Sequence, residues 1–155
     1  MHPTRAIIHL ENLRFNIAEI RKHVGQDIRV CVPVKADAYG HGALKIAVAA
    51  IRSGATHLAV ASAQEGVALR EAGIVAPILS FSIPIPEEIP ALIEHDIVPF
   101  IFDMEYIDEF SRHAAAMNRV VPVHLKIDTG MGRIGCTPED APALARRIAR
   151  DKHLK

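Results

Sequence analysis

Apolar positions near the N-terminus recur at spacings of three and four residues, which predicts an amphipathic helix. These positions are Leu10, Leu13, Ile17, Ile20 and Val24. Gly25 follows them and is a typical helix stop. The next segment, Ile28 to Val34, is short and rich in β-branched residues, which is typical of a buried strand.

The same two patterns then alternate along the rest of the chain. The predicted strands are short and apolar, and they cover 28–34, 57–61, 77–81, 97–102 and 120–127. The helices that follow them are expected over 43–51 and 62–72 and from Pro86, Asp103 and Thr137. Strand–helix units with short connections require a parallel sheet. An open doubly wound sheet and a (β/α)8 barrel both fit this pattern, although five units are too few to close a barrel.

Three of the predicted helix starts carry capping signals. Ser62 to Glu65 matches a capping box, in which the serine accepts from the first turn and the glutamate reaches back to the serine amide. Asp103 is a suitable N-cap for a helix whose apolar stripe runs from Ile107 to Met117. Thr137 is followed by acidic residues, which favour the first turn of a helix. The chain is expected to end within or just after this last helix, without a further strand.

Composition and charge narrow the class of protein. Of the 155 residues, 50% are hydrophobic and 23% are charged, and the formal net charge is zero, a balance typical of soluble globular proteins. No long run of one charge sign occurs, so neither nucleic acid nor an anionic membrane is an expected partner. The apolar runs are too short to span a membrane. Met1 to His9 contains no apolar stretch of signal-peptide length, so a cytoplasmic location is expected.

Cysteine and histidine usage predicts neither disulfides nor metal. The two cysteines, Cys31 and Cys136, are expected to be reduced thiols, because the chain has few cysteines and no secretory signal. The histidines are scattered without metal-ligand spacing, so no zinc site is expected.

The first candidate site segment, Val34-Lys-Ala-Asp-Ala-Tyr-Gly-His-Gly42, lies at the end of the first predicted strand. Active sites of parallel sheets lie at the carboxyl ends of the strands. Desolvation there favours the neutral, nucleophilic form of an amine, which makes Lys35 a candidate nucleophile or base. Tyr39 adds a hydroxyl donor, while Gly40 and Gly42 permit unusual backbone angles and close approach of a ligand. An ordinary loop whose lysine points to water is the alternative for this segment alone.

The second candidate segment, Lys126-Ile-Asp-Thr-Gly-Met-Gly-Arg-Ile-Gly135, follows the fifth predicted strand. If the strand alternation persists, His124, Lys126 and Asp128 share one face. Buried charges need partners, and Arg133 supplies a planar, permanently charged donor group. The segment alone also fits a plain glycine-rich loop.

Together, the two segments resemble the alanine racemase family. The resemblance extends over the whole chain and includes Leu58 to Glu65 and Leu69 to Gly73. It implies a fold in which an N-terminal (β/α)8 barrel is followed by a C-terminal β domain. Residues 1–155 match only about the first five strand–helix units. An incomplete barrel domain is therefore expected, with the remaining units and the β domain absent.

The resemblance also assigns roles to individual residues. It implies that Lys35 bonds covalently with pyridoxal 5'-phosphate and transfers the α-proton of the substrate. Tyr39 matches a tyrosine that contacts the cofactor phosphate, and Arg133 matches an arginine near the cofactor's phenolic oxygen. Lys126 matches a lysine that is carbamylated in some members and helps to position that arginine. Asp128 is expected to support the same segment.

The implied activity is the interconversion of L-alanine and D-alanine, which supplies D-alanine for bacterial cell-wall peptidoglycan. The alternatives are a broad-spectrum amino-acid racemase and a non-catalytic pyridoxal-phosphate-binding barrel protein. His41 is expected to be a turn or helix-start residue and not a catalytic group. The full-length protein is expected to be a homodimer. The isolated 155-residue chain is expected to be inactive and poorly soluble, because an unclosed parallel sheet exposes strand edges and apolar faces.

Overall fold

A computed structural model describes residues 4–155, in which the predicted helices and strands occur in the predicted order and α2 is an additional short element. Met1–Pro3, the start of the segment considered as a signal peptide, lie outside the described residues. The strands are β1 (Cys31–Pro33), β2 (His57–Val60), β3 (Ile78–Ser80), β4 (Ile97–Ile101) and β5 (His124–Leu125). The helices are α1 (Leu10–Val24), α2 (Lys35–Gly40), α3 (Ala43–Arg52), α4 (Ala63–Glu71), α5 (Ile89–Glu94), α6 (Met104–Ala116) and α7 (Ala141–Ala149), with a 3-10 turn η1 (Pro86–Glu88) before α5.

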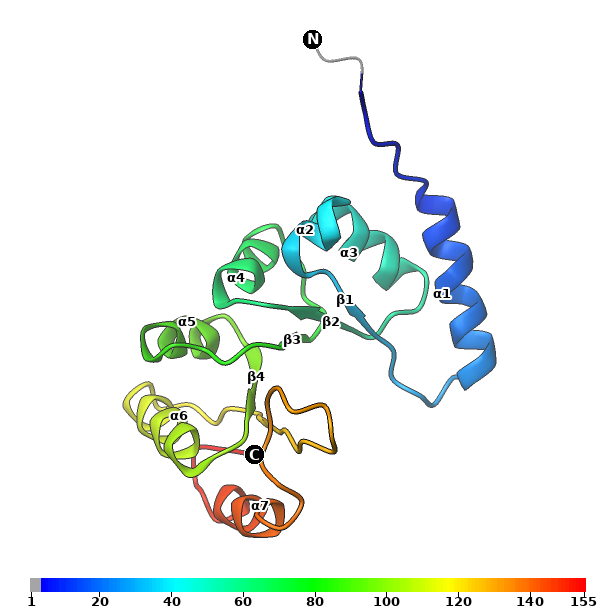
Figure 1. Cartoon of the computed structure of the whole chain (residues 1–155). Coiled ribbons are helices and arrows are strands. Elements are labelled where there is room, and N and C mark those ends of the chain that lie inside the picture. Colours follow the sequence, from blue (N-terminus) through cyan, green and yellow to red (C-terminus); the bar gives the residue numbers. More distant parts are fainter. Residues whose placement is uncertain (1–3) are drawn as a thin grey trace.

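The five strands are all parallel and lie in the order β1-β2-β3-β4-β5. Each strand is thus added beside the previous one, and the order never reverses. A doubly wound sheet reverses its strand order between its two halves, whereas a (β/α)8 barrel adds strands in sequence. Figure 1 shows α4, α5, α6 and α7 following one another in an arc along one side of the strands. The prediction of a partial (β/α)8 barrel is confirmed, and the doubly wound alternative is excluded.

The main core lies between the sheet and these helices. Leu58, Ile78 and Ile97 occupy matching register positions in β2, β3 and β4, and each is at most 1% exposed. Phe110 of α6 belongs to the same cluster and is fully buried. Gly66 permits α4 to approach the sheet closely, because a Cβ added there would lie 2.4 Å from Cδ1 of Ile97. The first turn of α4 therefore has a fixed position on the sheet.

Helix α1 has the predicted bounds but packs along only part of its apolar stripe. Ile17 is buried against Ala50 and Ala55. Ile20 and Val24, which the spacing places on the same stripe, are 48% and 36% exposed. The cause is length: α1 has 15 residues and extends past the ten-residue α3 that it packs against (Figure 1). The predicted helix is confirmed, and the last two positions of its stripe are not covered within residues 4–155.

The fifth strand is much shorter than predicted. The spacing predicts 120–127, whereas β5 spans two residues, and pairing with β4 ends soon after it. Pro122 interrupts the segment, since proline has no backbone N–H for a ladder. Val121 forms a parallel bridge with Leu154 instead, and its N–H donates to the carbonyl of His153 over 2.8 Å. Residues 153–155 thus pair with the segment before β5 through an isolated bridge, while no further strand follows α7, as the sequence predicts.

The N-caps Ser62 and Asp103 are confirmed, the glutamate half of the predicted capping box is not formed, and α7 begins later than predicted. The Ser62 Oγ accepts from the Glu65 N–H over 3.2 Å, and the Asp103 carboxylate accepts from the first turn of α6 over 2.9 Å. Helix α7 begins at Ala141 because Thr137 first forms a turn, in which its hydroxyl accepts from the Asp140 N–H over 3.1 Å.

Two expectations from composition concern membranes and cysteines. None of the helices formed by residues 4–155 combines the length and hydrophobicity that a membrane crossing requires. Cys31 and Cys136 are both free thiols, as predicted. Burial raises the pKa of Cys31 to about 11, so its thiol is protonated and unreactive near neutral pH.

Candidate active site

Lys35 lies at the carboxyl end of β1, directly after Val34, which is 1% exposed. The lysine is itself half-buried. Its amine makes no hydrogen bond or ion pair with any residue from 4 to 155. The side chain is therefore held at the rim of the sheet while its amine is free for a ligand.

The backbone after Lys35 forms a left-handed helical turn. Ala36 to Tyr39 have φ between 50° and 57° and ψ between 36° and 51°. Gly40 and Gly42 also have positive φ, at 82° and 90°, as the sequence predicts. A left-handed conformation costs a non-glycine residue roughly 1–2 kcal/mol, so four in succession persist only where the surroundings stabilise them. Nothing in the sequence pattern predicts this run.

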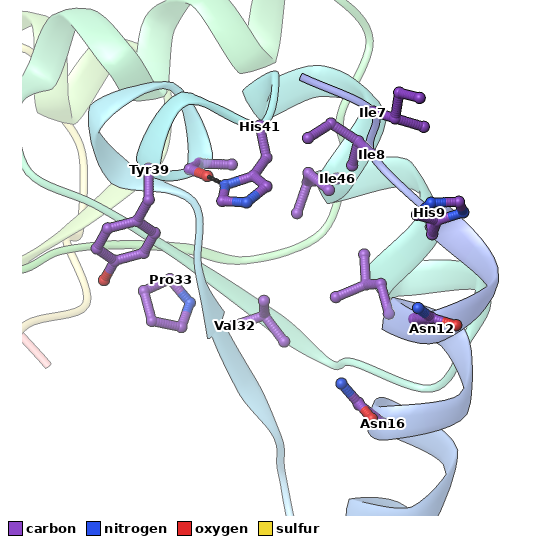
Figure 2. A pocket seen from close by; sticks show the side chains of 12 residues that line it. Ile7, Ile8, His9, Asn12, Asn16, Val32, Pro33, Tyr39, His41 and Ile46 are labelled. Atoms are coloured by element: carbon purple, nitrogen blue, oxygen red, sulfur yellow. Dashed lines mark hydrogen bonds between the residues drawn. The ribbon is translucent and has the colours of Figure 1, made fainter. Parts of the chain in front are cut away.

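Residues within the motif stabilise part of this turn. The Asp37 carboxylate accepts from the Ala43 N–H over 2.7 Å and so caps α3. His41 Nδ1 lies 2.7 Å from the Ala38 carbonyl, which the dashed line in Figure 2 marks. His41 is thus a turn residue, as the sequence predicts, and Asp37 joins the turn to the helix after it.

Tyr39 lines a pocket of about 400 Å³ that lies between α1 and the edge of β1. Figure 2 shows Asn12 and Asn16 of α1 on one side of this pocket and Val32, Pro33 and Tyr39 on the other. The Tyr39 side chain is 59% exposed, and its hydroxyl has no partner within residues 4–155. This hydroxyl is a free donor close in the chain to Lys35.

The second motif folds around the Asp128 carboxylate. One carboxylate oxygen accepts from the Gly130 N–H over 2.9 Å and from the Gly132 N–H over 3.1 Å. The Asp128 N–H donates to the Cys136 carbonyl over 2.8 Å, which closes the loop. Asp128 therefore supports the loop through backbone amides. The strand alternation on which a shared face of Lys126 and Asp128 depends ends at Leu125. No ion pair joins Asp128 to Arg133 within residues 4–155.

Lys126 and Arg133 line a second pocket, of about 150 Å³, together with Phe81 and Phe100. The Lys126 ammonium donates to the carbonyl of its neighbour Ile127 over 2.9 Å. Arg133 is exposed, and its guanidinium has no partner in the part of the chain that the structure describes. The two aromatic rings stack with their centroids 4.9 Å apart. The pocket thus presents two cations beside an aromatic wall.

The two motifs lie at opposite edges of the sheet. Lys35 and Tyr39 follow β1, Arg133 follows β5, and the two pockets share no lining residue. The edge strands are separated by four strand spacings of about 4.8 Å each. In a closed barrel of eight strands, the first and fifth face each other across the mouth. The structure therefore places the predicted residues on one rim without joining them in one pocket.

Glu65 has partners that the capping-box prediction misses. Its carboxylate does not reach the Ser62 amide: one oxygen accepts from the Ala61 N–H over 2.7 Å and the other from the Ala36 N–H over 2.8 Å. The side chain thus joins the end of β2 to the residue after Lys35. The capping pattern singles out Glu65 in the sequence, but it does not indicate Ala36 as the partner, because Ala36 is 29 residues away.

The Asp128 contacts predict a pH dependence of the second loop. Hydrogen bonds from the Gly132 and Gly130 amides lower the pKa of Asp128 from its ordinary value of 3.8. A carboxyl with a depressed pKa in the folded state stabilises that state above its ordinary pKa, and this contribution is lost as pH falls through the depressed value. We expect the Asp128 carboxyl to titrate below 3.8 in a carbon-13 NMR titration. Asp128→Asn serves to assign the signal, and a midpoint at or above 3.8 contradicts the prediction.

Comparison with known proteins gives one family throughout. The family model described as alanine racemase, N-terminal domain, matches residues 8–155. The alanine racemase of Treponema denticola is 57% identical over 155 residues, which is 100% of this chain and 41% of that protein. The alanine racemase of Halothermothrix orenii is 38% identical over 153 residues and is covered to 40%. The chain thus spans about two-fifths of the length of these curated relatives.

Solved structures agree with the sequence matches. An alanine racemase from Clostridium difficile 630 superposes with a TM-score of 0.89 at 34% identity, covering 94% of this chain and 38% of that one. A histidine racemase from Leuconostoc mesenteroides superposes with a TM-score of 0.83 at 25% identity, covering 94% of this chain and 39% of that one. On the family match over nearly all of its length, this chain belongs to the alanine racemase family and corresponds to its N-terminal domain.

Proposed function

We propose that the polypeptide containing this chain is a pyridoxal-5'-phosphate-dependent alanine racemase. The observation that carries the proposal is the free amine of Lys35 at the carboxyl rim of the sheet, in a chain of this family. Relatives named alanine racemase match the chain over its full length. A relative from Clostridium difficile is described in complex with cycloserine, and one from Bacillus anthracis with bound L-Ala-P.

The residues present fit the cofactor chemically. An amine, a phenol hydroxyl and a guanidinium, on Lys35, Tyr39 and Arg133, have no partner within residues 4–155. These are the groups that an aldehyde, a phosphate and a phenolic oxygen require. The run of positive φ from Ala36 to Gly40 also lets the backbone turn tightly at the rim. No competing ion pair has to be broken for these side chains to bind an anionic aldehyde.

Each residue then has a defined task. Lys35 would hold the cofactor covalently and, once the substrate amine has replaced it, move the α-proton on one face of the substrate with Nζ. Tyr39 would donate to the phosphate, and Arg133 to the phenolic oxygen. Lys126 and the Asp128-centred loop would keep Arg133 in place. When bound, the cofactor supplies the delocalisation that stabilises the negative charge on the α-carbon.

The remainder of the protein is part of the proposal. Residues 1–155 would form the first units of a (β/α)8 barrel that further barrel units and a C-terminal β domain complete. The substrate is alanine, the assembly a homodimer and the location cytoplasmic. The relatives of about two and a half times this length support the longer chain.

A broader amino-acid racemase is the second candidate. The superposition with a histidine racemase supports it, because that enzyme carries a similar fold over the same part of its chain. The residues described above would serve either substrate, because they would bind the cofactor and move the α-proton. Neither task depends on the side chain of the substrate.

A substrate panel on the full-length protein loaded with pyridoxal phosphate tests the proposal. We expect racemisation of L-alanine at a kcat/KM at least about 100-fold above that of histidine, lysine or arginine, which is the discrimination that pocket shape achieves. Circular dichroism of the product follows the reaction. Comparable turnover of the larger amino acids contradicts alanine specificity, and cofactor binding without racemisation favours a non-catalytic binding protein.

A further inference from the structure

The pairing of β1 with β2 ends just before the Lys35 segment, and beyond that point a carboxylate accepts hydrogen bonds from both chain segments. The last registered pair is Pro33 with Ala59, and the Val34 N–H still donates to the Ala59 carbonyl over 2.8 Å. Beyond it, the N–H groups of Ala36 and Ala61 both donate to the Glu65 carboxylate, over 2.8 and 2.7 Å. Glu65 therefore links the two chains where the backbone ladder no longer does.

Glu65 is itself firmly placed. Its own N–H donates to the Ser62 hydroxyl over 3.2 Å, which fixes it in the first turn of α4. The next residue, Gly66, is buried against Ile97 so closely that α4 cannot approach further. A carboxylate in such a position is a fixed acceptor for the turn that follows Lys35.

The left-handed turn also has a hydrogen-bond partner outside the motif. Its remaining hydrogen bonds involve residues 34 to 43, such as those of Asp37 with Ala43 and of His41 with Ala38. These contacts hold the turn together, while the Val34 bond to Ala59 and the burial of Ala38 join it to the sheet. In the described part of the chain, Glu65 is the side chain from another strand–helix unit that bonds to the turn.

From these contacts we infer that Glu65 is a positioning residue for Lys35, an inference that rests on the proposed function. The Ala36 amide is the peptide that follows Lys35, so fixing its N–H fixes the direction in which the lysine side chain leaves the rim. The amine has to reach both the cofactor aldehyde and the substrate α-carbon. A displacement of about 1 Å at such a group costs on the order of 100-fold in rate.

The test uses Glu65→Gln in the full-length protein, with Glu71→Gln as matched control. Glutamine has one carbonyl oxygen, so it keeps at most one of the two hydrogen bonds. Glu71 is an exposed residue of the same helix, and its carboxylate makes no hydrogen bond or ion pair within residues 4–155. We expect Glu65→Gln to lower kcat about 10- to 100-fold with little change in KM for alanine, while the control keeps wild-type kinetics.

Two further readouts separate positioning from general stability. Amide exchange measured without cofactor is expected to become faster at Ala36 in Glu65→Gln and to stay unchanged in the control. Borohydride reduction of the loaded protein, followed by peptide mass spectrometry, is expected to trap less cofactor on Lys35. Glu65→Ala loses both hydrogen bonds and is expected to show larger effects. If Glu65→Ala does not fold, the test rests on Glu65→Gln alone.

The inference is overturned if Glu65→Gln has wild-type kcat, or if its Ala36 exchange matches that of the control. A wild-type protein that neither binds the cofactor nor racemises alanine instead overturns the proposed function. The two failures are distinguishable, because the exchange measurement needs no cofactor and no activity.

Discussion

Replacing Lys35 with alanine in the full-length protein is expected to lower kcat/KM for alanine by at least about 1,000-fold. Two contributions are lost together: the covalent hold on the cofactor and the group that moves the α-proton. No other lysine follows β1 at the rim, since Lys45 lies within α3. The measurement is racemisation followed by circular dichroism, together with the absorbance band of the bound cofactor.

Lys45→Ala is the matched control for this experiment. Lys45 is an exposed lysine in the first turn of the next helix, and it makes no ion pair within residues 4–155. Its replacement is expected to leave racemisation and absorbance unchanged. If Lys35→Ala also racemises alanine at the wild-type rate with an unchanged absorbance band, Lys35 does not have the role proposed for it.

Gly135→Ala is expected to have the second-largest effect, through the loop that carries Arg133. Gly135 has a φ of +135°, and an added Cβ would lie 2.5 Å from the Asp128 N and 2.8 Å from the Ile127 carbonyl carbon. These are backbone atoms, which cannot swing aside as a side-chain end does. The Asp128 N–H is also the donor that closes the loop on the Cys136 carbonyl. Relief of the clash therefore requires the loop to move.

Gly130→Ala separates this clash from backbone strain. Gly130 has a similar φ of +126°, but an added Cβ meets nothing within 4 Å. Gly130→Ala is thus expected to cost about 1–3 kcal/mol in the free energy of unfolding, from strain alone. Gly135→Ala is expected to cost about 2 kcal/mol more, which is typical of overpacking, and to lower kcat/KM about 10- to 100-fold by displacing Arg133. Urea unfolding and alanine racemisation measure the two effects. Equal losses in the two variants mean that the close approach of backbone at Gly135 has no consequence.

Local sequence was sufficient for the element order because each element is coded by nearby residues. The apolar spacing of α1, the serine and aspartate caps of α4 and α6, and the β-branched strands all act within a few residues. Where a distant residue intervenes, the prediction fails. The predicted strand over 120–127 is divided, because the segment around Val121 pairs with Leu154 from beyond the last helix.

In the candidate site, too, some features follow from local sequence and others depend on distant residues. The motifs placed Lys35, Tyr39 and Arg133 at strand ends, because strand ends follow from local pattern. The hydrogen-bond partners of the charged side chains could not be predicted from the local pattern. The Asp128 carboxylate accepts from amides of its own loop, and the Glu65 carboxylate accepts from the Ala36 amide, which belongs to a different strand–helix unit. The spacing of residues along the chain does not indicate which N–H donor lies nearest to a carboxylate in the folded protein.

The sequence by itself determined that this protein is a series of parallel strand–helix units with a lysine at the rim after the first strand. It also carried the resemblance that the family match confirms. Only the tertiary structure decided that the strands add in barrel order, that the backbone after Lys35 is left-handed, and that Glu65 holds it to the sheet. The physical reason is that hydrophobic periodicity and capping act over one or two turns of chain. Strand order, close packing and the satisfaction of buried amides depend on residues that only folding brings together.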